Sequence, residues 1–215
     1  MAAATAPETS LREILTTEEE IEAILGKPAP RALTKVVDSL DDICLAFIAR
    51  SPFILVASSD AAGRVDVSPK GDPAGFVHVL DHRTIAIPER PGNRRADTFH
   101  NVLQNPKVGL IFIIPGKGET LRVSGTARIA RDTWLRERMT VANRVPDLAL
   151  VVTVEEAFMH CTKCMVRSRM WQPDTWNAGG LALIAEAIVV HGRLADFSVA
   201  ELQAMSENDI RTRLY

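Results

Sequence analysis

Two adjacent arginines, Arg94 and Arg95, follow a Pro-Gly-Asn segment and precede a segment typical of a helix. A helix N-terminus offers free backbone N–H groups, and an arginine guanidinium can bind two oxygens of one phosphate. Gly92 allows a tight backbone turn and Asn93 is a candidate helix cap. Basic side chains at this point oppose the helix dipole unless an anion lies between them. The pattern indicates a phosphate site, with a solvated surface pair as the alternative interpretation.

A second stretch, "RVDVSPKGDP", supports the phosphate interpretation. It reads as a strand that ends in Ser68 and Lys70, which offer a hydroxyl and an ammonium group. A further strand then leads into "PERPGNRR". Lysines at strand ends are usually solvated, but the two stretches together favour a local anion site.

A third candidate for chemistry is the cluster of His160, Cys161 and Cys164. A Cys-x-x-Cys segment can bind zinc or exchange thiols. No second Cys pair or His pair completes a zinc ligand set, so we expect no metal. A structural metal, a redox dithiol and a plain strand-to-helix junction stay open as interpretations.

Composition limits the function classes. The 215 residues are 47% hydrophobic and 24% charged, with a net charge of −2, so no global basic field would attract nucleic acid or an anionic membrane. No apolar run is long enough to span a bilayer, and the N-terminus does not read as a secretory signal. Three cysteines argue against a disulfide framework, so we expect a cytoplasmic protein.

The elements that must position these residues change along the chain. The pattern predicts a loose lead-in over residues 1–16 and a helix over 18–25, opened by a capping box of Thr17 and Glu20. A second helical segment follows, with Leu40, Ile43, Cys44 and Phe47 on one face.

From Phe53 onward, apolar and alternating runs such as "FILVASS", "TIAIP" and "LALVVTVEEAFMH" predict about six strands, joined mostly by tight turns. Antiparallel pairing in a closed or nearly closed small barrel suits this pattern. Helices are expected at 94–104, 132–143 and 181–192, and again from Ser198, where Glu201 repeats the capping-box spacing. We divide the chain into an N-terminal helical segment packing on the barrel (1–50), a barrel core (51–175) and a helical tail (176–215).

The run from Phe53 to Arg131 resembles the FMN-binding split-barrel proteins of the pyridoxamine 5'-phosphate oxidase type. The segments "GRVDVSPKGD", "TIAIPERPGNRRADTFHNVLQNPKVGLIF" and "ETLRVSGTARI" carry this resemblance. It implies a mainly β fold with flanking α, a six-stranded antiparallel split β-barrel with N- and C-terminal helices. It also implies a homodimer that binds FMN between two protomers.

The resemblance implies cofactor-binding roles for thirteen residues. Lys70, Arg94 and Arg95 would hold the phosphate, with Asn93 beside them, and the backbone at Val67, Ser68, Ile87 and Pro88 would lie along the flavin ring. Arg122 and Ser124 would approach from the second subunit. Lys163, Arg167 and Trp171 would lie near the site after the His-Cys segment, with a core role for Trp171 as the alternative.

The tail departs from the true oxidases, which end in a tryptophan followed by a Gly-x-Arg-x-His type segment. The segment His191-Gly192-Arg193 resembles that pattern only superficially, so pyridoxamine phosphate is not the expected substrate. We expect an FMN-dependent oxidoreductase that acts on an unidentified small molecule, with NAD(P)H as a candidate electron donor. A deazaflavin-dependent reductase on the same fold and a non-catalytic flavin- or haem-binding protein are the alternatives. No catalytic side chain is identified.

Overall fold

The computed structural model describes Leu11 and residues 13–215, in two units, Met1–Lys35 and Val36–Tyr215. The first unit contains α1 (Glu18–Leu25) and α2 (Pro30–Leu33). The capping box of Thr17 and Glu20 is confirmed, and α1 ends at Gly26, whose φ of 75° suits glycine. Most of the expected lead-in lies outside the described residues, and the packing of segment 1–50 on the barrel stays a prediction.

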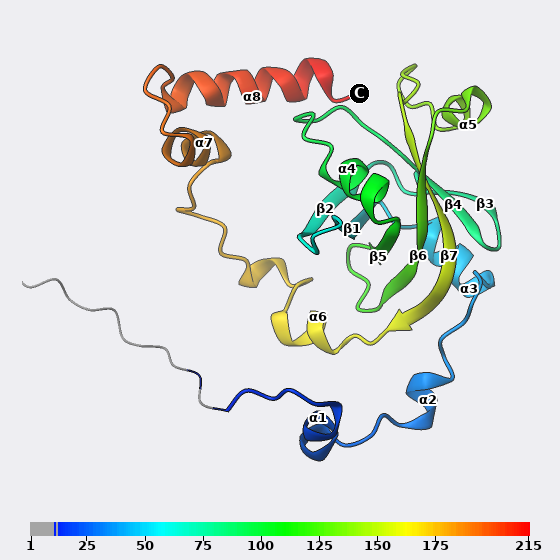
Figure 1. Ribbon diagram of the computed structural model, residues 1–215. Coiled ribbons are helices and arrows are strands. Elements are labelled where there is room, and N and C mark those ends of the chain that lie inside the picture. The colour runs from blue at the N-terminus through cyan, green and yellow to red at the C-terminus, as the bar shows by residue number, and fades with distance from the viewer. Residues whose placement is uncertain (1–10, 12) are drawn as a thin grey trace, which may run out of the picture. The chain divides into compact units, whose positions relative to one another are not determined.

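The second unit is built on one antiparallel sheet of seven strands, not six (Figure 1). The strands are β1 (Phe53–Ser59), β2 (Val65–Gly71), β3 (His78–Asp81), β4 (Thr84–Pro88), β5 (Lys107–Ile113), β6 (Thr120–Ala130) and β7 (Ala149–His160). Their order is β2-β1-β5-β6-β7-β4-β3. The sheet thus has one strand more than the predicted count of about six, and β3 is a four-residue edge strand that pairs only with β4 among the described strands. The mainly antiparallel β fold with flanking helices is as predicted. Among the described residues, the two edge strands β2 and β3 are not paired with one another, so the sheet is not closed into a complete barrel.

Local chemistry explains the tight connection between β1 and β2. The Asp60 carboxylate accepts hydrogen bonds from the backbone N–H groups of Ala62 and Arg64, both at 2.9 Å. Gly63 adopts a φ of 79°, which glycine tolerates without strain. This turn fixes the register in which Lys70 of β2 lies opposite Ile54 of β1.

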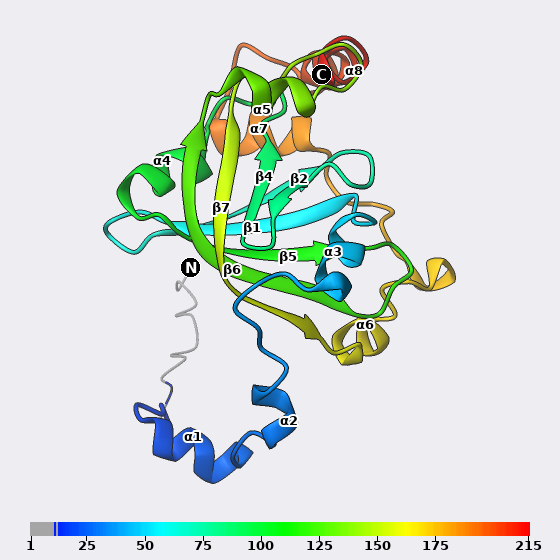
Figure 2. The ribbon, with the colours of Figure 1, turned by 90° about the vertical axis from the view of Figure 1, so that its right-hand side faces the viewer.

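Strands β6 and β7 are the longest described strands (Figure 2). A register shift between Ser124 and Gly125 interrupts their pairing. A Cβ atom added to Gly125 would lie 2.0 Å from the carbonyl oxygen of Thr153. Only glycine therefore fits at this β-bulge.

Helices flank the sheet. They are α3 (Asp42–Ile48), α4 (Asp97–Gln104), α5 (Thr133–Arg138), α6 (Lys163–Ser168), the 3-10 turn η1 (Pro173–Thr175), α7 (Ile184–Gly192) and α8 (Val199–Arg213). Helix α4 packs against β1, β2 and β6, and α7 packs against α8. The capping box of Ser198 and Glu201 is confirmed at the start of α8.

Three predicted helices were too long at one end, and the one expected over 181–192 begins only at Ile184. The helix expected over 94–104 begins at Asp97, because Arg94 and Ala96 adopt left-handed backbone with φ of 61° and 52°. The helix expected over 132–143 covers Thr133–Arg138 only, and two left-handed residues, Ala142 and Asn143, follow it.

The main core lies between the inner face of the sheet, α3 and α4. Phe47 of α3, Phe99 of α4 and Phe112 of β5 belong to it, together with Ile54 and Ile87 from two further strands. This core holds α4, and therefore the loop before it, against the ends of β1 and β2. None of the described helices has the length and apolar character needed to cross a membrane.

Candidate anion site

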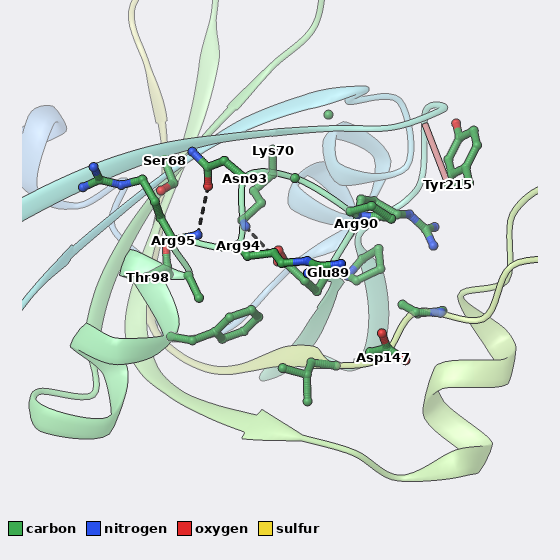
Figure 3. A pocket seen from close by; sticks show the side chains of 18 of the residues that line it. Ser68, Lys70, Glu89, Arg90, Asn93, Arg94, Arg95, Thr98, Asp147 and Tyr215 are labelled. Carbon is green, nitrogen blue, oxygen red and sulfur yellow. Dashed lines mark hydrogen bonds and ion pairs between the residues drawn. The ribbon is translucent and has the colours of Figure 1, made fainter. Parts of the chain in front are cut away.

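A hollow of about 1010 Å³ lies where the ends of β2 and β4 meet the loop that precedes α4 (Figure 3). Phe76, Phe99 and Pro88 give it an apolar side. Its charged lining carries more positive than negative side chains: Lys70, Arg90, Arg94, Arg95, Arg144 and Arg213 against Glu89, Asp97 and Asp147. An excess of cations in a concave, partly shielded place favours an anionic ligand.

Lys70 and Glu89 form an ion pair inside this hollow. The Lys70 Nζ atom lies 2.9 Å from Glu89 Oε2, and the side chains are 21% and 29% exposed. The same ammonium lies 5.7 Å from the centre of the Phe99 ring, within reach of a cation–π interaction. Figure 3 shows the two charged groups directed toward one another. The pair holds a cation in a fixed place at the end of β2.

A second ion pair, between Asp72 and Arg90, lies beside the first. Arg90 Nε is 2.5 Å from Asp72 Oδ2, and the Asp72 side chain is only 1% exposed. Arg90 also donates to the carbonyl oxygen of Met139 at 2.9 Å. The Tyr215 hydroxyl donates to Asp72 Oδ1 at 2.9 Å, and this hydrogen bond raises the pKa of Tyr215. All polar atoms of the Asp72 carboxylate are thus engaged, which is typical of a structural ion pair.

The loop before α4 holds the arginine pair in an unusual backbone. Asn93 Oδ1 accepts a hydrogen bond from the backbone N–H of Arg95 at 3.0 Å. The expectation that Asn93 caps the helix was therefore wrong, because Ala96 occupies the cap position. The side chains of Arg94 and Arg95 point in different directions, and Arg94 extends on the side of Glu89 (Figure 3). The loop thus presents one of the two arginines to Lys70 and its partner.

The two arginines also differ in their partners. Arg95 Nε pairs with Asp97 at 2.8 Å and its side chain is 72% exposed. Across the described part of the chain, the Arg94 guanidinium has neither a hydrogen bond nor an ion pair. Arg94 therefore has its five donors available to a ligand, whereas Arg95 has a competing carboxylate.

Six of the thirteen predicted cofactor-binding residues line this hollow: Ser68, Lys70, Pro88, Asn93, Arg94 and Arg95. The Ser68 hydroxyl is already engaged, since it donates to Asp66 Oδ2 at 2.7 Å. Val67 is exposed on β2, and Ile87 is fully buried in the core, so neither side chain lines the hollow. The predicted contact of their backbone with a flavin ring stays a prediction.

The other five predicted residues lie elsewhere in the chain: Arg122, Ser124, Lys163, Arg167 and Trp171. Ser124 lines a second hollow of about 640 Å³ on the sheet, with Lys107 and Glu155. The Arg122 guanidinium lies 5.0 Å from the centre of the Phe158 ring. Lys163 and Arg167 belong to α6, and Trp171 Nε1 donates to the Lys117 carbonyl oxygen at 2.7 Å. None of the five lines the first hollow.

The His-Cys segment lies at the end of β7. His160 Nδ1 is buried and has no hydrogen-bond partner among the described residues, while Cys161 and Cys164 are free and exposed. No described group of three or more His, Cys, Asp or Glu side chains could hold a metal ion. Cys44 is a buried thiol, and its burial raises its pKa to about 11.

Three residues of the hollow and its border were missed from the sequence: Asp72, Glu89 and Tyr215. The first two carried a readable signal, because "KGD" at the end of β2 and "ER" after β4 have complementary charge order. Nothing local to Tyr215 marks it, since its partner Asp72 lies 143 positions earlier in the chain.

The fold and this cationic hollow define a split-barrel protein with a candidate anion site. Residues 40–161, more than half of the chain, match the family profile described as Pyridoxamine 5'-phosphate oxidase. The chain belongs to this family, as its sequence resemblance indicated. No protein of curated function matches the chain.

Several solved structures are similar at low identity. A variant of HupZ from Group A Streptococcus is 21% identical, with a TM-score of 0.47, over 56% of this chain and 99% of that one. An FMN-binding protein from Syntrophomonas wolfei is 10% identical, with a TM-score of 0.42, over 53% and 80%. HutZ, a haem storage protein from Vibrio cholerae, is 16% identical, with a TM-score of 0.41, over 57% and 94%.

Proposed function

We propose that this protein is an FMN-dependent oxidoreductase of the pyridoxamine 5'-phosphate oxidase-like class, acting on a small molecule. The observation that carries the proposal is that Lys70 and Arg94, with Arg95 beside them, line one hollow although they come from two separate stretches of the sequence. Membership of the family makes a flavin the first ligand to test.

The residues of the hollow fit the phosphate group of FMN. The unpaired guanidinium of Arg94 can bind two phosphate oxygens, and Lys70 adds a point charge at a fixed place. The apolar side, with Phe76 and Phe99, suits the part of a ligand that carries no charge. In this arrangement Lys70 and Arg94 would bind the phosphate and orient the ligand, and the aromatic side chains would exclude water from the hollow.

The bound flavin would supply the electron transfer itself, and the chain would hold and shield it. We assign no catalytic acid or base role to the side chains of the hollow. The substrate is proposed to differ from pyridoxamine phosphate. His191 and Gly192 close α7, and Arg193 caps it with a φ of 50°, which is ordinary helix termination and not an anion grip.

We propose a homodimer in which the second copy completes the flavin site. Arg122, Ser124, Lys163, Arg167 and Trp171 lie outside the hollow of their own chain, as expected if they serve the partner's cofactor. The proposal also places the protein in the cytoplasm, in keeping with its free cysteines.

The test begins with the purified full chain. Its visible spectrum, and the quenching of FMN fluorescence on titration, should reveal a flavin complex that NAD(P)H or dithionite reduces. Fluorescence of the released cofactor distinguishes FMN from a deazaflavin, and a Soret band would indicate haem. A colourless protein that fails to bind added FMN would refute the proposal. A flavin complex that no reductant cycles would favour a binding protein without turnover.

The phosphate role of the hollow has its own control. Arg94→Ala should weaken FMN binding, while Arg128→Ala, a change on β6 outside the hollow, should not. The dimer is tested by sedimentation, and by complementation: a mixture of Arg94→Ala and Arg122→Ala chains should recover part of the FMN sites.

A further inference from the structure

Glu89 is an unexpected group in a hollow that favours anions. Its carboxylate lies among Lys70, Arg90 and Arg94, where it would repel a phosphate that approached the same cations. A carboxylate in this place lowers the affinity for any anion unless it forms a favourable contact with that ligand.

The two oxygens of Glu89 differ in their engagement. Oε2 accepts the hydrogen bond from Lys70 Nζ at 2.9 Å. Within the described residues, Oε1 accepts no hydrogen bond from any side chain or backbone group. Since an ionised carboxylate accepts hydrogen bonds and donates none, a ligand can satisfy Oε1 only with a donor of its own.

The Lys70–Glu89 pair is thus a donor and an acceptor fixed side by side. The neighbouring Asp72–Arg90 pair has no such spare capacity, since Tyr215 already occupies the second oxygen of Asp72. Glu89 is also 29% exposed, so a ligand in the hollow can reach it.

We propose that Glu89 determines ligand specificity at this site. Its carboxylate selects ligands that present a hydrogen-bond donor beside an anionic group, such as hydrogen phosphate or the phosphate ester of a polyol. It disfavours oxyanions of similar size that carry no donor, such as sulfate. This inference rests on the proposed function insofar as the hollow must take a phosphate group, and it names the chemistry by which that group is recognised.

The test compares inorganic phosphate with sulfate, two tetrahedral ions of similar size. At about pH 8 both ions are mostly doubly charged, and only phosphate retains a proton. Dissociation constants come from amide NMR shifts of the loop before α4 at constant ionic strength. The wild-type chain should bind phosphate more tightly than sulfate by about tenfold, which corresponds to one hydrogen bond to a charged group.

The variant Glu89→Gln should lose this preference, mainly because its amide can donate to sulfate. The matched control is Glu155→Gln, which removes the carboxylate of a second Lys–Glu pair, with Lys107, outside this hollow. The control should keep the wild-type preference for phosphate.

Several outcomes would overturn the proposal: no preference in the wild-type chain, no binding of either ion, or a preference that survives in Glu89→Gln. If Glu89→Gln weakened the binding of phosphate and of sulfate equally, Glu89 would serve only to position Lys70. That result would also overturn the proposal. The wild-type comparison decides even where the variant is unstable. An FMN titration of the same samples tests the proposed function separately, since either result can fail while the other stands.

Discussion

Asp72 and Arg90 join two strand ends that are not neighbours in the sheet. The ion pair of 2.5 Å links the end of β2 to the end of β4, while the sheet order separates these strands by β1, β5, β6 and β7. Lys70 and Glu89 repeat the link with the charges exchanged. Side chains, and not backbone hydrogen bonds, therefore hold the two ends of the sheet together at the hollow.

The first prediction concerns this link. Asp72→Ala should lower the free energy of unfolding by about 3–5 kcal/mol, because it leaves the shielded Arg90 without its counter-charge. Urea denaturation followed by circular dichroism measures the change. The double variant Asp72→Leu with Arg90→Met should be clearly more stable than Asp72→Ala. A single variant as stable as wild type would show that the pair does not close the sheet.

The second prediction separates stability from binding at Arg94. Arg94→Gly should leave the free energy of unfolding unchanged or slightly higher, because a φ of 61° costs about 1 kcal/mol in a residue other than glycine. The same variant should bind FMN at least tenfold more weakly, through loss of a bidentate phosphate contact. Thermal denaturation and fluorescence quenching measure the two effects. Unchanged affinity would remove Arg94 from the site.

The third prediction concerns the bulge in β6. Gly125→Ala should destabilise the chain by more than about 2 kcal/mol, since the added Cβ would meet the Thr153 carbonyl oxygen at 2.0 Å. Gly109→Ala on β5 is the control, because a Cβ there meets no atom within 4 Å. Melting temperatures of the two variants provide the comparison. If both melted alike, the close approach of β6 and β7 at this point would be refuted.

The fourth prediction is a pH dependence. Burial raises the pKa of Cys44 from 9.0 to about 11, so the folded state retains the thiol proton over a range in which the unfolded state has lost it. The contribution of Cys44 to stability is therefore complete below about pH 9 and is lost as the pH rises toward 11. Denaturation at a series of pH values, for wild type and Cys44→Ala, isolates this effect. Parallel stability curves would contradict the prediction.

Much of the fold could be predicted from local sequence. The capping boxes at Thr17 and Ser198 lie where the spacing placed them, because each depends on residues three positions apart. The strand runs were recognised by alternation and turns. The start of α4 was missed, because left-handed backbone at Arg94 and Ala96 has no signature in residue type.

The candidate site, like the fold, could be predicted from local sequence only in part. Lys70 and the arginine pair were predicted because each occupies the end of a recognisable element. The partners that define their electrostatics were not, because Glu89 and Asp72 act through pairs 19 and 18 positions apart in sequence. Such pairs exist only once β2 and β4 have been brought together by the rest of the sheet.

Pro69 stands next to Lys70, on the outermost strand of the sheet. Because proline has no N–H to offer, the outer margin of β2 is a poor template for an incoming strand. The edge strand that carries Lys70 is thereby protected against edge-to-edge pairing with another chain, and a non-proline residue at position 69 should weaken that protection.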